Sequence, residues 1–148
     1  MNYEATIDGV LYSNNKKLLQ KDLIYNYLSK ESYWAKGIPL QIVTEAIDCS
    51  VCFGAFKGNK QIAFARLITD NATFGYLADV FVLEEYRGKG ISKNLMKVIM
   101  DYPPCKKFRR FMLATKDAHA LYEKFGFKKM ISPERIMEIK PFEDYNNK

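Results

Sequence analysis

A short segment of glycines and basic residues, Arg87-Gly88-Lys89-Gly90, combines the features of an anion-binding turn. It follows an apolar, strand-like run from Tyr76 to Leu83 and precedes a helix-like pattern of apolar residues. Gly88 and Gly90 lack a Cβ, so the backbone there can turn sharply and approach a ligand closely. The first amides of a helix have no intrahelical acceptor, and together with the helix dipole they attract anions. Because Arg87 and Lys89 add positive charge, the segment predicts a site for a pyrophosphate group.

The spacing of this segment excludes two common phosphate-binding motifs. A Walker loop needs Gly-x-x-x-x-Gly-Lys-Ser/Thr, and a dinucleotide fingerprint needs a third glycine where this chain has Lys93. The pattern that fits is Arg/Gln-x-x-Gly-x-Gly/Ala, which runs from Arg87 to Ser92 with serine in the last position. It resembles the coenzyme A loop of the GNAT superfamily of acyl-CoA N-acyltransferases. An ordinary strand-to-helix turn with surface charges is the alternative interpretation.

A second segment, residues 111–127, resembles another conserved stretch of the same superfamily. Its pattern, Ala-x-x-Leu-Tyr-x-x-x-Gly-Phe, begins at Ala118 and contains Tyr122. The apolar residues recur at helical spacing, and Gly126 suits a left-handed helix end. In the superfamily this tyrosine lies close to the thioester sulfur. Two motifs in this order, about 30 residues apart, are far more specific than either motif alone.

The resemblance covers nearly the whole chain, from about Tyr3 to Pro141, and is strongest to a bacterial subgroup of small, single-domain GNAT proteins. The shared features are a Tyr-Trp pair after the first helix, an Ala-Arg before a Thr-Asp turn, and Thr-x-Asp-Ala-His before the tyrosine. The amine substrate does not come with the resemblance. Thr115 is a departure, because the wider superfamily often has an asparagine there that contacts pantetheine. A hydroxyl can do part of that work.

The resemblance implies an N-acetyltransferase that moves an acetyl group directly from acetyl-CoA to a primary amine, with an amino acid or a peptide N-terminus favoured as acceptor. It implies no metal. The cofactor-binding residues that it implies are Phe81, Val82, Arg87, Gly88, Lys89, Gly90, Ile91, Ser92 and Thr115. The alternative from another class is a GNAT-fold protein that binds acyl-CoA as a sensor or interaction module without turnover.

Amide formation from a thioester needs a proton donor for the departing thiolate and a donor for the tetrahedral oxyanion. Tyr122 is the candidate acid, because a phenol with a pKa near 10 stays protonated at neutral pH. The alternative interpretation is that Tyr122 is an aromatic core residue on a helix with no role in catalysis. The oxyanion donor is expected to be a backbone amide, that of Val82 or Phe81.

Asp79 is the candidate for contact with the amine. It stands in the apolar run Leu-Ala-Asp-Val-Phe-Val, where a lone carboxylate is costly unless it is paired or usefully placed. Strand alternation puts Asp79, Phe81 and Leu83 on one face and Val80 and Val82 on the other. We expect Asp79 to hold the amine or to take its proton through water. Glu84 and Glu85 are the alternatives.

Arg66 interrupts another apolar strand and is a candidate substrate-binding residue. A guanidinium pairs with a carboxylate in a bidentate way, so Arg66 with Asp79 would recognise both ends of an amino acid. The alternative is a structural bridge from Arg66 to Asp79 or Asp70. Tyr33 and Trp34 are expected either to wall this pocket or to form a hydrophobic plug behind the first helix.

The remaining reactive side chains carry weaker signals. His119 precedes Tyr122 by three residues, so it is either a relay beside the tyrosine or a packed or capping histidine. The three cysteines include a Cys49-x-x-Cys52 pair without a second pair, which favours reduced, partly buried thiols of a cytoplasmic protein. Nothing in the sequence resembles a metal site.

The elements that must position these residues alternate between strand and helix patterns. Strands are expected over residues 3–11, 50–56, 61–69, 73–83 and 108–114, and two short ones from Phe127 and over 135–139. Helices are expected within 18–28 and over 38–47, 88–101 and 116–125. This order predicts one α+β domain over residues 1–148, with a mixed, mostly antiparallel sheet of six to seven strands flanked by helices. The resemblance implies the GNAT fold, splayed between strands ending near Val82 and Ala114, where pantetheine inserts.

Composition limits the partners. No run of about 18 apolar residues occurs, so no membrane association is expected, and the N-terminus shows no secretion signal. The net charge is +6, but the basic residues are scattered, so no nucleic-acid partner is expected either. A cofactor with three phosphates explains the positive excess equally well. The sequence leaves the oligomeric state open, and a homodimer is one alternative because dimers are common in the superfamily.

Overall fold

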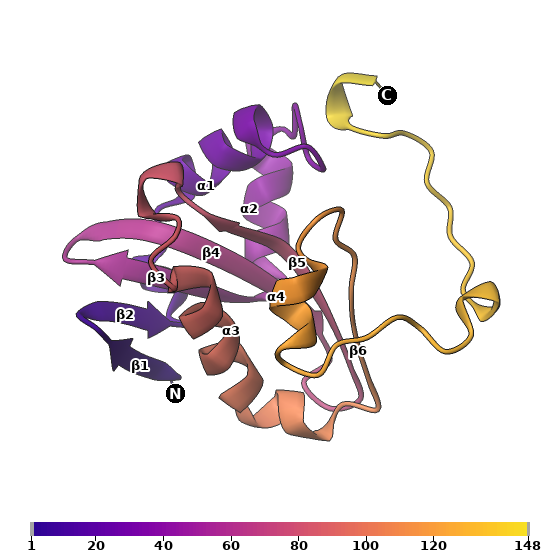
Figure 1. Cartoon of the computed structure of the whole chain (residues 1–148). Helices are drawn as coiled ribbons and strands as arrows, with labels where there is room; N and C mark the ends of the chain where they lie inside the picture. The colour runs from indigo at the N-terminus through magenta and orange to yellow at the C-terminus, as the bar shows by residue number, and fades with distance from the viewer. Residues whose placement is uncertain (1, 148) are drawn as a thin grey trace.

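A single mixed sheet organises the chain in the computed structural model, which describes residues 2–147 (Figure 1). Its six strands lie in the order β1-β2-β3-β4-β5-β6. Neighbours from β1 to β5 are antiparallel, and β6 runs parallel to β5. The strands are β1 (Glu4–Ile7), β2 (Val10–Ser13), β3 (Val51–Lys57), β4 (Lys60–Thr69), β5 (Phe74–Val82) and β6 (Arg110–Leu113).

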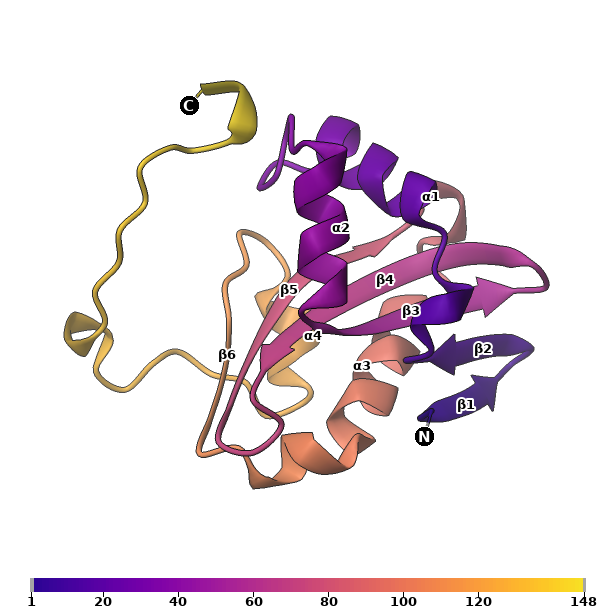
Figure 2. The same ribbon diagram turned by 180° about the vertical axis from the view of Figure 1, so that it is seen from behind.

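Helices cover both faces of this sheet, as Figures 1 and 2 show from opposite sides. The α-helices in residues 2–147 are α1 (Lys21–Asn26), α2 (Leu40–Asp48), α3 (Ile91–Asp101) and α4 (His119–Glu123). A π-helical turn, Tyr27–Glu31, continues α1. One buried cluster joins α1 and α2 to the sheet around Phe64 and Phe81, and the other joins α3 to the opposite face around Phe53 and Leu67. The expected α+β sandwich is confirmed.

The helix after the glycine segment follows its sequence pattern closely. Ile91, Leu95, Val98 and Ile99 were expected on its buried side, and all four are buried against the sheet. The helix ends at Asp101, before Pro103, because proline cannot donate the next hydrogen bond. It begins at Ile91, three residues later than expected, because Gly90 has a left-handed φ of 78° and serves as the N-cap.

The N-terminal strand was predicted as one element over residues 3–11, and this is wrong. Asp8 and Gly9 have φ values of 52° and 78°, so the chain reverses there. Two successive residues with positive φ form the tight turn that suits the twist of a hairpin. The segment therefore forms two paired strands, β1 and β2, and the paired residues run from Glu4 with Ser13 to Ile7 with Val10.

The sheet opens between β5 and β6. β6 pairs only with Phe74–Leu77 of β5, whereas β5 continues to Val82. The second half of β5 therefore has β4 on one side and no strand on the other among the described residues. The expected splay between these two strands is confirmed.

The C-terminal part of the chain differs from expectation. The helix predicted over residues 116–125 is shorter, His119–Glu123. The strands predicted from Phe127 and over 135–139 are absent, so the sheet has six strands. Residues 128–147, here called the strap, leave the body as an extended segment with 3₁₀ turns at Pro133–Arg135 and Tyr145–Asn147. No helix among the described residues is long and apolar enough to cross a membrane.

Candidate active site

The glycine segment lies at the open end of β5 and borders a groove of about 380 Å³. Gly88 and Gly90 have φ values of 76° and 78°, which L-residues with side chains adopt only at a cost. A Cβ at either position would meet no atom within 4 Å, so both glycines face open space. The groove, here called the loop groove, is also lined by Val80, Phe81, Val82, Arg87, Ile91 and Ser92.

The two basic side chains of the segment behave differently. Arg87 donates from Nε to the Val82 carbonyl at 3.0 Å and from Nη2 to the Tyr27 hydroxyl at 2.8 Å. Tyr27 in turn stacks on Phe81, with ring centroids 4.0 Å apart. Arg87 therefore fastens the segment to the end of β5. Lys89 is not in the groove lining, and its ammonium lies 5.6 Å from the centre of the Tyr86 ring.

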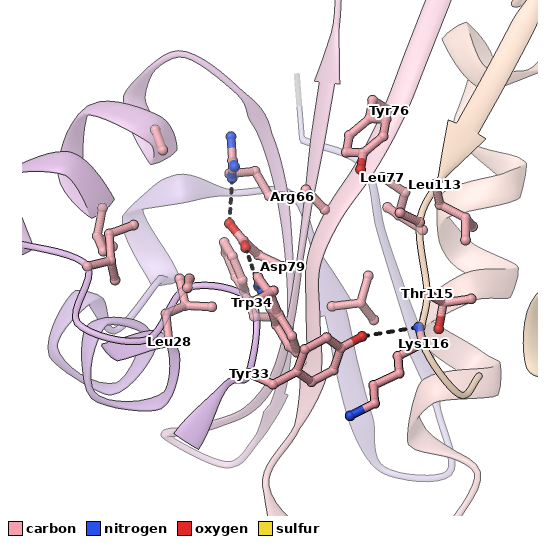
Figure 3. A pocket seen from close by; sticks show the side chains of 18 of the residues that line it. Leu28, Tyr33, Trp34, Arg66, Tyr76, Leu77, Asp79, Leu113, Thr115 and Lys116 are labelled. Carbon is pink, nitrogen blue, oxygen red and sulfur yellow. Dashed lines mark hydrogen bonds and ion pairs between the residues drawn. The ribbon is translucent and has the colours of Figure 1, made fainter. Parts of the chain in front are cut away.

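A second and larger cavity, about 720 Å³, lies on the face of the sheet that α1 and α2 cover. We call it the sheet pocket. Apolar side chains of α1 and α2 form its inner wall, and Arg66 and Asp79 place charges in it (Figure 3). It shares part of its lining with the loop groove. The shared residues are Tyr33, Trp34, Val80, Asp117, Ala118 and Tyr122.

Asp79 sits at an irregularity of β5. The pairing with β4 shifts between Phe64, opposite Phe81, and Arg66, opposite Ala78, so β5 carries an extra residue there. Asp79 has a φ of 55°, a left-handed conformation that costs energy in a residue other than glycine. A bulge of this kind redirects a side chain and leaves an amide without its ladder partner. The strained residue therefore aims its carboxylate into the sheet pocket.

The Asp79 carboxylate is held on both oxygens. Oδ2 accepts from Arg66 Nε at 2.8 Å, and Oδ1 accepts from Trp34 Nε1 at 2.7 Å (Figure 3). Arg66 also donates from Nη1 to the Ser50 hydroxyl at 3.1 Å. The bridge between Arg66 and Asp79 that the sequence left as one alternative is present. Among residues 2–147, Arg66 Nη2 makes no hydrogen bond.

The predicted division of β5 into two faces is confirmed from Asp79 onward. Phe81 and Leu83 pack in the cluster with α1 and α2, and Trp34 from the same side holds Asp79. Val80 and Val82 pack in the cluster with α3. The bulge breaks this alternation on the other side of Asp79, because Leu77 also belongs to the α3 cluster.

Tyr122 lies where the two cavities meet. Its side chain is buried in the cluster beside α3, and its ring lies 6.1 Å from that of Phe127. Burial is the main cause that raises the pKa of Tyr122 to about 12, and the neighbouring Tyr33 and Asp117 contribute to the same rise. The phenol therefore keeps its proton at neutral pH, as a general acid requires.

Tyr33 bridges the opening of the sheet. Its hydroxyl accepts a hydrogen bond from the Lys116 amide at 3.1 Å, and the Lys116 ammonium lies 5.3 Å from its ring centre. The ring packs edge-on against Trp34, 5.1 Å away. Figure 3 shows this hydrogen bond joining the loop that follows Tyr27–Glu31, which carries Tyr33, to the loop after β6, which carries Lys116. Tyr33 and Trp34 thus line the pocket, and Trp34 also packs against the buried cluster of α1 and α2.

The other expected site residues lie at its margins. Thr115 lines the sheet pocket and not the loop groove, and its hydroxyl accepts a hydrogen bond from the Ala118 amide at 3.0 Å. His119 is exposed and lines neither cavity. Sequence reasoning missed Tyr27 and Ser50, because nothing in their local pattern reports that they contact Arg87 and Arg66.

The structure brings no group of three metal-ligating side chains together within residues 2–147. Its cysteines are free thiols, with Cys49 exposed and the other two buried. Burial raises the pKa of the Cys52 thiol to about 12, so it stays protonated and unreactive at neutral pH.

Comparison with known proteins gives one family. A family model described as the acetyltransferase (GNAT) family matches residues 21–127. A protein of Gibberella zeae, named as a candidate acetyltransferase, is 31% identical over 77% of this chain and 76% of its own. A crystal structure of a candidate GNAT acetyltransferase from Xanthomonas campestris pv. campestris is 49% identical, with a TM-score of 0.88 over 91% of this chain and 95% of that one.

A more distant likeness concerns the fold alone. A structure from meticillin-resistant Staphylococcus aureus, described as a protein of unknown function and probable acetyltransferase, is 21% identical with a TM-score of 0.72. It covers 88% of this chain and 98% of that one. The overall fold of this chain therefore recurs in a protein of much diverged sequence.

Proposed function

Because this chain belongs to the acetyltransferase (GNAT) family, we propose that it transfers an acetyl group from acetyl-CoA to a primary amine within a ternary complex. The observation that carries the proposal is the position of Tyr122, which lines both the loop groove and the sheet pocket. A donor in one cavity and an acceptor in the other would meet at this phenol.

The loop groove suits the donor. The N-terminus of α3 and the open backbone at Gly88 and Gly90 fit a pyrophosphate, and Ile91 and Ser92 continue that wall. The Lys89 ammonium adds charge near the rim. Pantetheine would lie along Phe81 and Val82, where β5 has no neighbouring strand on the side away from β4 among the described residues. Arg87 holds this part of the groove lining in place, because its Nε donates a hydrogen bond to the Val82 carbonyl.

Acetyl transfer would use the residues that lie where the loop groove and the sheet pocket meet. The amine nitrogen attacks the thioester carbon, and the new C–N bond replaces the C–S bond. The departing thiolate takes the proton of the Tyr122 hydroxyl, and the tyrosinate recovers a proton from the acceptor nitrogen through water. A backbone amide of β5 beside the bulge, that of Phe81 or Val82, would stabilise the oxyanion.

The sheet pocket suits a small acceptor with an amine, and an amino acid or a peptide N-terminus is favoured. Each Asp79 oxygen already accepts one bond and keeps a second lone pair for an ammonium or a bridging water. Arg66 keeps Nη2 for a substrate carboxylate. Tyr33 and Trp34 line both cavities and supply an aromatic wall for the acceptor. The free cysteines fit the reducing interior of a bacterial cell, where we place the reaction.

The test is thiol release from acetyl-CoA in the presence of amino acids, polyamines, aminoglycosides or short peptides. Release that depends on one amine class, and that is lost in Tyr122→Phe while coenzyme A binding persists, would support the proposal. Tight coenzyme A binding without turnover on any amine would contradict it and favour a non-catalytic acyl-CoA sensor.

A further inference from the structure

The turn that continues α1 is of an uncommon kind. Tyr27–Glu31 is a π-helical turn, in which the Ser32 amide donates a hydrogen bond to the Tyr27 carbonyl at 2.9 Å. Such a turn holds one residue more than an α-helical turn, and π-helical turns are frequent at functional sites. The first residue of this turn, Tyr27, lines the loop groove.

Buried Ser32 fixes the turn. Its side chain is only 1% exposed, and its hydroxyl donates to the Leu28 carbonyl at 2.6 Å and accepts from the Ala35 amide at 3.1 Å. A buried polar group whose hydrogen bonds are satisfied makes the surrounding backbone rigid. The Tyr27 side chain therefore leaves the turn in a fixed direction.

The Tyr27 side chain joins two parts of the loop groove. Its ring stacks on Phe81 of β5, with an angle of 7° between the ring planes. Its hydroxyl accepts the hydrogen bond from Arg87 Nη2 at 2.8 Å, at the start of the glycine segment. Tyr27 therefore contacts the end of β5 and the glycine segment at the same time.

The glycine segment has few other ties to the fold. Within residues 2–147, the backbone hydrogen bonds made by residues 84–90 reach no farther than Leu83 and Asn94. A segment with only local backbone bonds can shift against the sheet at little cost. The bond between Arg87 and Tyr27 joins this segment to the turn after α1, so it limits such a shift.

The ring and the hydroxyl of Tyr27 have separable roles. A phenylalanine ring would still stack on Phe81, whereas the hydroxyl bonds a charged group, and such hydrogen bonds are stronger than neutral ones. Without the hydroxyl, Arg87 keeps its bond to the Val82 carbonyl, but its Nη2 loses this partner. Because Arg87 lines the groove, ordering its side chain again when a ligand binds would cost conformational entropy.

We propose that the Tyr27 hydroxyl positions the donor site: by holding Arg87, it keeps Val82 and the glycine segment in the arrangement that receives coenzyme A. Tyr27 is thus a positioning residue, which acts through the Arg87 guanidinium and not on the reacting atoms. This inference rests on the proposed function, since it takes coenzyme A as the ligand of the loop groove. Donor affinity then depends on a hydroxyl that lies outside both sequence motifs.

Calorimetry with coenzyme A tests the role of the hydroxyl. In Tyr27→Phe we expect the dissociation constant to rise about tenfold or more, because a bond to a charged group is lost while the stacked ring remains. Tyr25→Phe is the matched control, since Tyr25 lies on α1 and lines neither cavity. It should leave the constant unchanged, and denaturant unfolding should show that both variants are fully folded under the assay conditions.

Kinetics and a double variant separate positioning from a purely structural role. Tyr27→Phe should raise the KM for acetyl-CoA, while kcat at saturating donor and the KM for the amine stay within about twofold. In Tyr27→Phe/Arg87→Gln the affinity for coenzyme A should be no weaker than in Arg87→Gln alone, because the hydroxyl acts through the guanidinium.

The outcomes distinguish this inference from the proposed function. Failure of the unmodified protein to bind coenzyme A would overturn both together. Binding by the unmodified protein with an equal dissociation constant in Tyr27→Phe would overturn the inference alone. Additive losses in the double variant would also overturn it, because Tyr27 would then act independently of Arg87.

Discussion

Arg66 and Asp79 form a largely buried ion pair, with Nε and Oδ2 2.8 Å apart and side chains only 18% and 11% exposed. The pair bridges β4 to the bulge of β5, next to Val80, which lines both cavities. Removing one partner would leave the other charge in a poorly hydrated site. Such a loss costs more than the pair itself contributes.

Asp79→Asn should therefore destabilise the protein. Asparagine tolerates the φ of 55°, so the substitution isolates the charge from the backbone strain. We expect a loss of about 2 kcal/mol in the free energy of unfolding, because the Arg66 guanidinium keeps only neutral partners. Denaturant unfolding measures it. In the double variant Arg66→Leu/Asp79→Asn, which keeps at position 79 a residue that tolerates this φ, most of the loss should be recovered, and a double variant as unstable as the sum of Arg66→Leu and Asp79→Asn would contradict the pairing.

Tyr122→Phe should lower kcat by about 10² to 10⁴, the usual contribution of a general acid, with little change in the affinity for coenzyme A. Because burial raises the pKa of this phenol to about 12, the acid is fully protonated from pH 7 to 10. Loss of the tyrosine proton should therefore cause no decrease in kcat between pH 7 and 10. Steady-state kinetics across pH checks both points, and equal kcat in the two proteins would remove Tyr122 from the chemistry.

Much of this architecture could be predicted from local pattern. The helix stripe of α3 and the strands around β3, β4 and β5 follow from apolar spacing, and the glycine segment follows from its composition. The bulge at Asp79 could not be predicted, since it depends on the register between β4 and β5 and not on neighbouring residues. The inward side chain of Arg87 was missed for the same reason, because its partner Tyr27 is distant in sequence.

The C-terminal segment shows a different limit. Residues 135–139 have the alternation of a strand, but a strand needs a neighbour, and these residues pair with no strand among the described residues. The local sequence pattern indicates that a segment tends to be extended, but it does not show which strand could pair with it.

The role of Arg66 was open for a similar reason. The sequence allowed Arg66 either to bind a substrate carboxylate or to bridge to Asp79, and only the distance between the two side chains shows that the bridge is present.

Alkaline pH should weaken the fold through Cys52. In the folded protein burial raises the pKa of this thiol to about 12 from an ordinary value near 9. Above pH 9 the unfolded chain loses this proton while the folded chain keeps it, so stability is full below pH 9 and falls as pH rises toward 12. We expect this thiol to cost about 1 kcal/mol by pH 10.

Unfolding free energies at pH 8 and pH 10 measure the effect. Cys52→Ala should reduce the difference between the two pH values, whereas Cys49→Ala, at an exposed thiol, should leave it unchanged. The comparison concerns the pH difference and not the absolute stability, because Cys52→Ala also removes packing. An unaltered difference in Cys52→Ala would show that this thiol does not carry the linkage.

Two glycine substitutions separate strain from ligand contact. Gly90→Ala and Gly58→Ala both place a Cβ on a residue with positive φ, 78° and 59°, and neither Cβ meets an atom within 4 Å. Each should therefore cost about 1 kcal/mol of unfolding free energy through backbone strain. Gly58 lies in the β3–β4 turn, away from both cavities, whereas Gly90 lines the loop groove. Only Gly90→Ala should also weaken coenzyme A binding in calorimetry, by about tenfold or more, because its Cβ would stand where the proposed site has the pyrophosphate approach the backbone. Equal affinities in the two variants would move the phosphate site away from this segment.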